Sequence, residues 1–439
     1  MFPGIRLLVG VSIVLSASRF EPRADEPLPG LERFYIGTYS GAIRVSTLNL
    51  ETGALSAPTV AASIGDPSFL ALTPDRKFLY AVNEGGGTVG AFSVNPTSGA
   101  LKLLNQRSSN GGAPAHIVVD GSGRNVIVAN YSGGSVSVFP ILTNGQLGVA
   151  TARIQHPGSG PLAHCTTLDA SNRFAFVCDK GLDQVRSYLF DPVAGTLVTN
   201  KVPFASVPRG SGPRHMTFDL QYKRAYVICE LSSTIIGFNY DAANGVMTPF
   251  QTNSTLLPGG FTGANTTAEI VMHPSGKFLY GSNRGKNTIA VFSVNEGDGT
   301  FKPVQQQTPG ATPRKFAIDP TGRYCIVAGQ SSNDIRLYTI DPQSGQLSDT
   351  GQKMSVSAPV CIVPFILQPP QPILAARSLA RNALELNVGH GLDLLTYQVY
   401  QSAELSANAN WNLLATGRPG QTNFLLTNTL PANSSASGC

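Results

Sequence analysis

The sequence is built from a repeated unit. Six copies begin near residues 67, 114, 162, 213, 268 and 313, about 50 residues apart. The copy at 213, PRHMTFDLQYKRAYVICELSSTIIGFNYDA, holds three short β-rich runs separated by turn residues, which is typical of an antiparallel meander. A turn such as DPVAGTL (191) or DPQSGQL (341) then leads to a fourth short run. Four strands per repeat predict the blade of a β-propeller.

The two ends of the repeat array predict a closed ring. Residues 33 to 56, RFYIGTYSGAIRVSTLNLETGALS, look like a seventh repeat without its opening strand. The segment APVCIVPF, residues 358 to 365, can supply that strand and leave no free sheet edge. No segment keeps a 3.6-residue period, which excludes a helical solenoid. We therefore predict an all-β chain with a seven-bladed β-propeller over residues 32–366; six or eight blades are the alternatives.

The composition agrees with this class and limits the partners. Charged residues make up 13% and hydrophobic residues 42%, with 46 Gly and 31 Pro, as expected for a turn-rich β protein. The net charge is +5 without any block of Lys and Arg, so we predict no nucleic-acid partner.

The N-terminus resembles an export signal. Residues 1–18, MFPGIRLLVGVSIVLSAS, combine one Arg, a short apolar run and small residues, which predicts a signal peptide. Residues 19–31 are predicted to be a linker. The apolar run is short for a membrane span, so we expect an exported mature chain without one. A disordered segment, a core strand or an uncleaved anchor are the alternatives.

The pattern changes after the repeats. Residues 367–373 contain LQPPQP, a stiff Pro-rich linker. Residues 374–439 read as short strands between turns and predict a small C-terminal β-sandwich-like module. We expect this module to be incomplete or to pair with something else; a β-rich tail packed on the propeller is the alternative.

The six cysteines match no paired CxxC zinc pattern, and we predict no metal site and no cofactor. Cys178 and Cys229 are placed at the same position of neighbouring repeats, each before an acidic residue. Export would permit a disulfide, but small apolar strand residues are the favoured interpretation.

Polar residues recur at two positions of the repeat, and such residues gather around the central channel of a propeller. The first position lies in the opening strand, with His116, His164, Arg214 and His215. The second follows the second apolar run, and we align there Asn83, Asn130, Asp179, Glu230, Asn283 and Gly329, with Glu84, Tyr131, Lys180, Leu231, Arg284 and Gln330 next to them.

Each candidate has a structural alternative. A repeated Asn after a strand usually closes a turn, and we favour that role for Asn83, Asn130 and Asn283. Turn geometry explains Glu230 poorly, because Cys229 and Leu231 flank it. A lone His in an apolar strand is more often a core residue. No nucleophile elbow, HExxH or phosphate loop is present, so any catalysis is expected to use general acid/base chemistry.

The repeats resemble the lactonase family of seven-bladed propellers, which includes propeller-type 6-phosphogluconolactonases and carboxy-muconate lactonising cycloisomerases. The resemblance rests on FYIGTYSG (34), PAHIVVDGSGRNVIVANYSGGSVSVFP (114), LAHCTTLDASNRFAFVCDKGLDQV (162) and GPRHMTFDLQYKRAYVICEL (212). It implies a catalytic set of His164, Arg214, Glu230 and Arg284. Around these we place the substrate-binding candidates His116, Asn130, Asp179, His215 and Asn283.

This chain departs from the family pattern at three positions. Leu162 replaces a His that often precedes the Ala163–His164 pair. Cys178 stands where a Pro is common, and Lys180 where a Leu is common.

The resemblance implies hydrolysis of a sugar lactone. Glu230 or His164 would activate water, and a carboxylate base would need a raised pKa. Arg214 and Arg284 would stabilise the oxyanion and hold an anionic substituent. The expected partner is a small lactone or sugar acid, and the chain is expected to be a monomer. A cycloisomerase using the same residues, and a non-catalytic binding propeller at the cell surface, are the alternatives.

Overall fold

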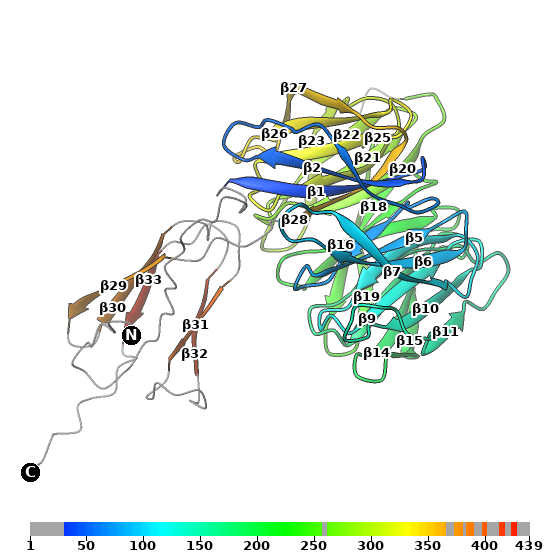
Figure 1. Ribbon diagram of the computed structural model, residues 1–439, viewed down its shortest axis with the longest axis horizontal. Helices are drawn as coiled ribbons and strands as arrows, with labels where there is room; N and C mark the ends of the chain where they lie inside the picture. The colour runs from blue at the N-terminus through cyan, green and yellow to red at the C-terminus, as the bar shows by residue number, and fades with distance from the viewer. Residues whose placement is uncertain are drawn as a thin grey trace, which may run out of the picture. The chain divides into compact units, whose positions relative to one another are not determined.

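The computed structural model describes residues 30–256 and 261–365 in full, and the backbone of five strands between residues 373 and 427. Every regular element in these ranges is a β-strand (Figure 1). The chain divides into two units, Gly30–Leu367 and Met1–Pro29 with Gln368–Cys439. The predicted signal peptide lies outside the described residues. Within the described part, no helix is long and apolar enough to cross a membrane.

The first unit contains seven four-stranded antiparallel sheets. The sheet of the N-terminal strands joins β28 (Pro359–Phe365), β1 (Leu31–Thr38), β2 (Ala42–Asn49) and β3 (Thr59–Ser63). The second sheet contains β4 (Leu70–Leu72), β5 (Phe78–Asn83), β6 (Thr88–Val94) and β7 (Leu101–Ser108). The third contains β8 (Pro114–Val119), β9 (Asn125–Asn130), β10 (Ser135–Pro140) and β11 (Ala152–Gln155). The fourth contains β12 (Ala163–Leu168), β13 (Phe174–Asp179), β14 (Gln184–Asp191) and β15 (Thr196–Ser206). The fifth sheet contains β16 (Pro213–Phe218), β17 (Arg224–Cys229), β18 (Thr234–Asp241) and β19 (Val246–Ser254). The sixth contains β20 (Thr266–Met272), β21 (Phe278–Arg284), β22 (Thr288–Val294) and β23 (Phe301–Gln307). The seventh contains β24 (Pro313–Ile318), β25 (Tyr324–Gly329), β26 (Asp334–Ile340) and β27 (Leu347–Ser355).

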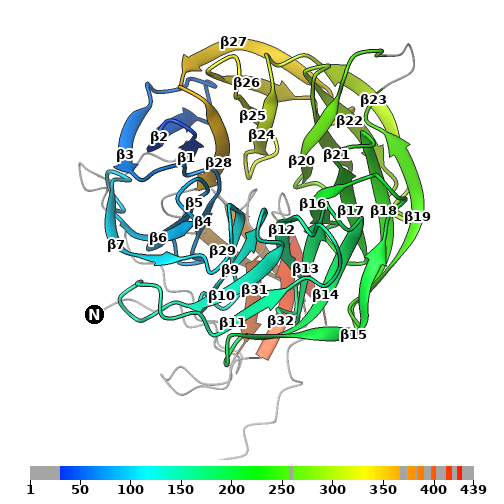
Figure 2. The same ribbon diagram turned by 90° about the vertical axis from the view of Figure 1, so that its right-hand side faces the viewer.

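The sheets are arranged as blades around a central channel (Figure 2). Strands such as β16, β20, β24 and β28 surround the centre, and strands such as β3, β7, β15 and β19 form the rim. The predicted closure is confirmed, because β28 pairs antiparallel with β1, with Cys361 opposite Gly37. A strand from the end of the repeat array therefore completes the first blade and removes the free edge.

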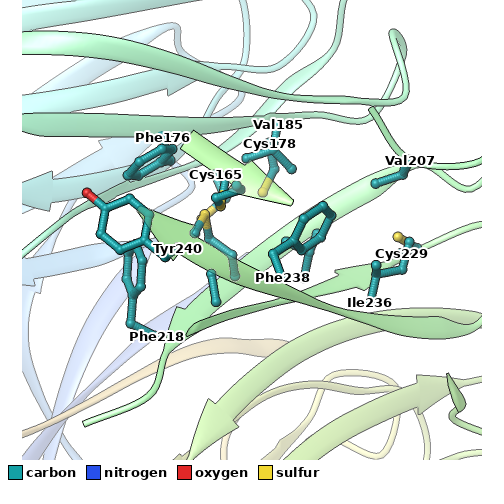
Figure 3. Packing of buried hydrophobic residues seen from close by; sticks show 14 of the residues in the cluster. Cys165, Phe176, Cys178, Val185, Val207, Phe218, Cys229, Ile236, Phe238 and Tyr240 are labelled. Carbon is teal, nitrogen blue, oxygen red and sulfur yellow. The ribbon is translucent and has the colours of Figure 1, made fainter. Parts of the chain in front are cut away.

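The core consists of seven apolar clusters, one between each pair of neighbouring blades. The second strands explain this arrangement, because β9 and β13 are buried along their whole length and carry apolar residues on both faces. Figure 3 shows the cluster between the β12–β15 and β16–β19 blades, where Cys165 and Cys178 lie among aromatic rings and Cys229 lies beside Ile236.

The cysteines agree with the favoured interpretation, since Cys165, Cys178, Cys229, Cys325 and Cys361 are buried and free. One alignment was wrong. Cys178 lies opposite Cys165, whereas Cys229 lies opposite Pro213, as Asp179 lies opposite Ala163. Cys229 is thus equivalent to Asp179 and not to Cys178.

Hydrogen bonds from tyrosine hydroxyls connect four pairs of neighbouring blades. Tyr35, Tyr80, Tyr226 and Tyr280 donate hydrogen bonds to the carbonyls of Gly99, Gly145, Gly299 and Gly345 at 2.7–2.9 Å. These glycines adopt positive φ angles in the hairpins that sequence patterns such as TGAL mark.

The second unit is described only through its strands. β29 (Ile373–Ala380), β30 (Ala383–Gly389) and β33 (Asn423–Thr427) form one sheet, and β31 (Tyr397–Gln401) and β32 (Asn412–Gly417) form another. The sandwich-like character and completeness predicted for residues 374–439 remain predictions.

Glu32 is a buried carboxyl group without a hydrogen-bond partner among the described residues. Burial and the charge of Asp319 raise the pKa of Glu32 well above its usual value. The folded state therefore binds this proton more tightly than the unfolded state, so Glu32 lowers stability as the pH rises above about 4.5.

The Glu32→Met variant is expected to raise the free energy of unfolding at pH 8 by about 1–3 kcal/mol. Urea denaturation at pH 5 and pH 8 measures this effect, and the gain should be smaller at pH 5. Glu51→Met, at an exposed turn position, is the control and should show no such gain. A variant that is less stable than wild type at pH 8 would contradict the account of Glu32.

Candidate active site

The inner strands share a β-bulge at the same position. Pairing with the second strand skips one residue in five blades, between Pro114 and His116 in β8, for example. The skipped residues are Ala115, His164, Arg214, Arg314 and Val360. A bulge turns a side chain away from the regular alternation of the strand, which suits the construction of a site.

All five bulge residues line a small hollow near the centre of the propeller, together with Ser68, Phe69, Glu84, His215, Glu269 and Lys315. Two of the predicted catalytic residues, His164 and Arg214, therefore face one pocket. Its lining carries three cationic side chains, Arg214, Arg314 and Lys315, against two carboxylates, Glu84 and Glu269. The excess of positive charge suits an anionic or strongly polar ligand.

The cross-strand register corrects two of our alignments. Cys229, and not Glu230, occupies the position of Asn130 and Asp179 at the end of the second strand. Similarly, Cys165 and not His164 is equivalent to His116 and His215. Glu230 belongs instead with the residues that follow the second strand: Tyr39, Glu84, Tyr131, Lys180, Arg284 and Gln330.

Glu230 is the centre of an ion-pair cluster. Its carboxylate contacts Lys180 Nζ at 2.7 Å, Arg214 Nε at 3.0 Å and Arg284 Nη2 at 3.2 Å. Although burial acts in the opposite direction, Arg214, Arg284 and Lys180 lower the pKa of Glu230 to about 2. Glu230 is thus ionised at neutral pH and is a weak base. Lys180, where the family pattern has Leu, also donates to the hydroxyl of Tyr131 at 3.2 Å.

Arg214 joins this cluster to the pocket. Its Nη1 donates to the carbonyl of Ala268 at 2.6 Å, and Arg284 Nη2 donates to the carbonyl of Thr267 at 2.8 Å. Burial, Arg284 and Arg314 lower the pKa of Arg214 to about 9, which leaves the guanidinium charged at neutral pH. The predicted Arg214, Glu230 and Arg284 therefore form one connected group.

His164 completes the predicted set. Its ring lies 5.1 Å from the ring of His215 and 5.5 Å from that of Tyr131, measured between centroids. Burial, followed by the charge of Arg214, lowers the pKa of His164 well below 6.5, so the imidazole is neutral at pH 7. Its buried Nδ1 makes no hydrogen bond within the described part of the chain. A buried imidazole with an unused ring nitrogen can exchange a proton with a ligand in the pocket.

Sequence reasoning missed Arg314. This guanidinium lies over the ring of Tyr39 at 5.4 Å and donates to its hydroxyl at 3.0 Å. The Tyr39 hydroxyl in turn donates to Glu84 at 2.7 Å. No ion pair joins Arg314 to a carboxylate in residues 30–256 or 261–365, so its charge is available to a ligand. The recurrence of Pro-Arg at 213 and 313 was the signal that could have revealed it.

A second layer of residues follows the bulges. His215 Nδ1 lies 3.1 Å from both carboxylate oxygens of Glu269, and Lys315 Nζ lies 2.5 Å from Glu269. Lys315 is also 4.8 Å from the ring centre of Phe69, which packs on His116 at 3.9 Å. Glu269 on β20 thus occupies the position of the repeat that His215 and Lys315 occupy on β16 and β24.

Four predicted substrate-binding residues are not part of the pocket lining: His116, Asn130, Asp179 and Asn283. The amide nitrogen of Asn130 contacts Ser109, Ser135 and Ser137, and Asn283 bonds to Thr255, Asn265 and Thr288. Asp179 accepts hydrogen bonds from the backbone N–H groups of Leu162, Gly181 and Leu182, at 2.8–3.0 Å, and contacts His156 Nδ1 at 2.5 Å. These bonds organise the turns that carry the site.

The Asp179→Ala variant is expected to lower the free energy of unfolding by about 3–5 kcal/mol, because the change leaves the buried His156 without its partner and removes the acceptor of three partly buried backbone N–H groups. Urea denaturation measures the loss. Asp191→Ala removes an exposed turn carboxylate in the same blade and should have a much smaller effect. Equal effects of the two changes would contradict a structural role for Asp179.

The comparisons with known proteins agree with this fold. The family model "Lactonase, 7-bladed beta-propeller" matches residues 33–364, and the chain belongs to this family. It is 32% identical to the 6-phosphogluconolactonase of Bacillus subtilis over 342 residues, covering 75% of this chain and 97% of the relative. The 6-phosphogluconolactonase of Formosa agariphila is also 32% identical, over 72% of this chain and 93% of its own length. The solved structure of the periplasmic gluconolactonase PpgL from Pseudomonas aeruginosa superposes with a TM-score of 0.73 at 30% identity, covering 77% of this chain and all of that one.

Proposed function

We propose that the protein hydrolyses a sugar lactone in the channel pocket. The observation that carries the proposal is the neutral His164, whose Nδ1 is unused, in one pocket with the cationic Arg214 and Arg314. A base and fixed positive charges are the two elements that ester hydrolysis needs. The names of the relatives, 6-phosphogluconolactonase and gluconolactonase, support the same substrate class.

His164 is the better candidate for the base. The sequence left Glu230 and His164 as alternatives, with the condition that a carboxylate base would need a raised pKa. The pKa of Glu230 is instead lowered to about 2. We therefore assign Glu230 a positioning role, in which its carboxylate orients Arg214 and Arg284.

The reaction follows from these roles. His164 Nδ1 takes a proton from a water molecule, whose oxygen attacks the lactone carbonyl carbon. Negative charge develops on the carbonyl oxygen, and the guanidinium groups of Arg214 and Arg314 stabilise it. The ring C–O bond then breaks, and the leaving oxygen receives the proton from His164. The product is the open-chain sugar acid.

The positive charge of the pocket lining favours a substrate that carries an anionic group. Arg314 has no carboxylate partner among the described residues and can bind a phosphate or carboxylate in a bidentate manner. Initial rates of proton release in a pH-stat, with spontaneous hydrolysis subtracted, test the function on glucono-lactone and on 6-phosphogluconolactone. We expect a rate above background on at least one of them. Folded protein without activity on either lactone would overturn the proposed function.

We also propose export of the mature chain. The features of residues 1–18 support this location, and the gluconolactonase from Pseudomonas aeruginosa is described as periplasmic. An exported enzyme would meet unphosphorylated lactones. Fractionation of cells that express the full chain would test this, and retention of all the protein in the cytoplasm would contradict it.

A further inference from the structure

Three consecutive blades place a metal-ligating side chain at the same register position. His116 on β8, Cys165 on β12 and His215 on β16 are each the first paired residue after the bulge. Because the three inner strands are neighbours around the channel, these side chains converge in the layer that also holds Phe69 and Glu269. The convergence depends on the bulges, and the sequence alignment had placed His164 in this layer instead of Cys165.

The three donor atoms are close together and shielded from water. One nitrogen of each imidazole and the sulfur of Cys165 all lie within 4.8 Å of one another. The exposed fractions of His116, Cys165 and His215 are 8%, 2% and 4%. Two imidazoles and one thiolate form a ligand set that suits Zn²⁺, which often takes three protein ligands and one exchangeable ligand.

A second, independent feature supports a metal. His215 Nδ1 faces both oxygens of Glu269, and Lys315 holds that carboxylate in place. A carboxylate that accepts the N–H of a histidine fixes the tautomer and leaves the Nε2 lone pair for a metal ion, an arrangement typical of metal-binding histidines. Arg214 Nη1 contacts Nε2 only at 3.3 Å and has a shorter bond to the carbonyl of Ala268, so Nε2 is weakly engaged.

The thiol of Cys165 shares hydrogen bonds with the side chains of Cys178 and His116. The remaining contacts of His116 and Cys165 are long. The N–H of Thr166 approaches His116 Nδ1 at 3.4 Å, and the sulfur of Cys165 lies 3.6 Å from the hydroxyl of Thr167. Neither contact is strong enough to compete with a metal–ligand bond.

We propose that His116, Cys165 and His215 bind one Zn²⁺ ion in the layer that follows the bulges, next to the pocket. Binding deprotonates the thiol of Cys165, and its proton is released to the buffer. His215 also lines the pocket and lies 3.3 Å from Arg214 Nη1, so an effect on activity would not separate the metal site from the proposed hydrolysis. The test of the metal site therefore reads metal binding and not activity.

Isothermal titration of the chelator-treated full chain with Zn²⁺ tests the proposal, and Co²⁺ provides a spectroscopic probe. We expect one ion per chain, and a thiolate-to-metal charge-transfer band with Co²⁺. Cys165→Ser should remove the band and weaken binding, and Glu269→Gln should weaken Zn²⁺ binding about 10–100-fold. Thermal melting verifies that each variant is folded.

Two cysteine variants are matched controls. Cys325 lies on β25, in a different blade from the triad, and Cys439 lies outside the described residues. Cys325→Ser and Cys439→Ser should both keep the band and the affinity. Equal affinity in wild type and Cys165→Ser, or a Co²⁺ complex without a thiolate band, would overturn the proposal.

Discussion

The Arg214→Ala variant is expected to lower kcat/KM for the lactone about 10²–10³-fold, because it removes a fixed positive charge from the developing oxyanion. The loss should appear mainly in kcat, since the interaction strengthens in the transition state. Arg214→Lys retains the charge but not the planar fork, and should recover only part of the activity. Initial rates in a pH-stat measure all three proteins.

Arg336→Ala is the matched control for this change. Arg336 also forms an ion pair, with Asp334 at 2.8 Å, but it does not line the pocket. Its loss should leave kcat/KM within about twofold of wild type, as is usual for residues outside a site. A folded Arg214→Ala protein with nearly wild-type kcat/KM would contradict the assignment of the oxyanion donor.

The His164→Ala variant is expected to lose about 10²–10⁴-fold in kcat, the usual contribution of general-base catalysis. In the wild type, burial and Arg214 lower the pKa of His164, so the imidazole stays neutral until the pH is well below 6.5. The activity should therefore persist from pH 7 to below 6.5 and fall only when His164 becomes protonated. The dependence of kcat/KM on pH measures this fall of activity on the acid side.

His273→Ala is the control for a buried histidine. His273 Nε2 lies 2.8 Å from the carbonyl of Gly322, and Nδ1 lies 2.8 Å from Ser275, in a turn that does not line the pocket. This change should lower the free energy of unfolding and leave unchanged the pH at which kcat/KM falls on the acid side. An unchanged pH profile in His164→Ala would instead exclude His164 as the base.

The recurring apolar runs of the sequence predicted the propeller fold for a physical reason. Each blade must bury both faces of its second strand, so the apolar runs recur at fixed spacing and can be counted. The closing strand was recognisable for the same reason, because APVCIVPF fills the one position that the first repeat lacks.

The sequence selected residues that lie close together in the fold, while their catalytic roles remain predictions and their geometry was not foreseen. His164, Arg214, Glu230 and Arg284 do gather at the channel, yet the bulges shift the register by one residue and are invisible in a hydrophobic pattern. The register makes His164 equivalent to Arg214, whereas the sequence comparison matched His164 with His215 and therefore aligned Glu230 with Asp179. The lowered pKa of Glu230 depends on three cations from separate blades, which only the folded chain brings together.

The most direct test of the central claim, that the channel pocket hydrolyses the lactone, is a crystal structure with an aldonolactam, an analogue whose ring amide resists hydrolysis. We predict that its carbonyl oxygen lies within hydrogen-bond distance of the guanidinium of Arg214 or Arg314, with His164 Nδ1 facing the carbonyl carbon. An analogue that inhibits the enzyme competitively but binds outside this pocket would contradict the account.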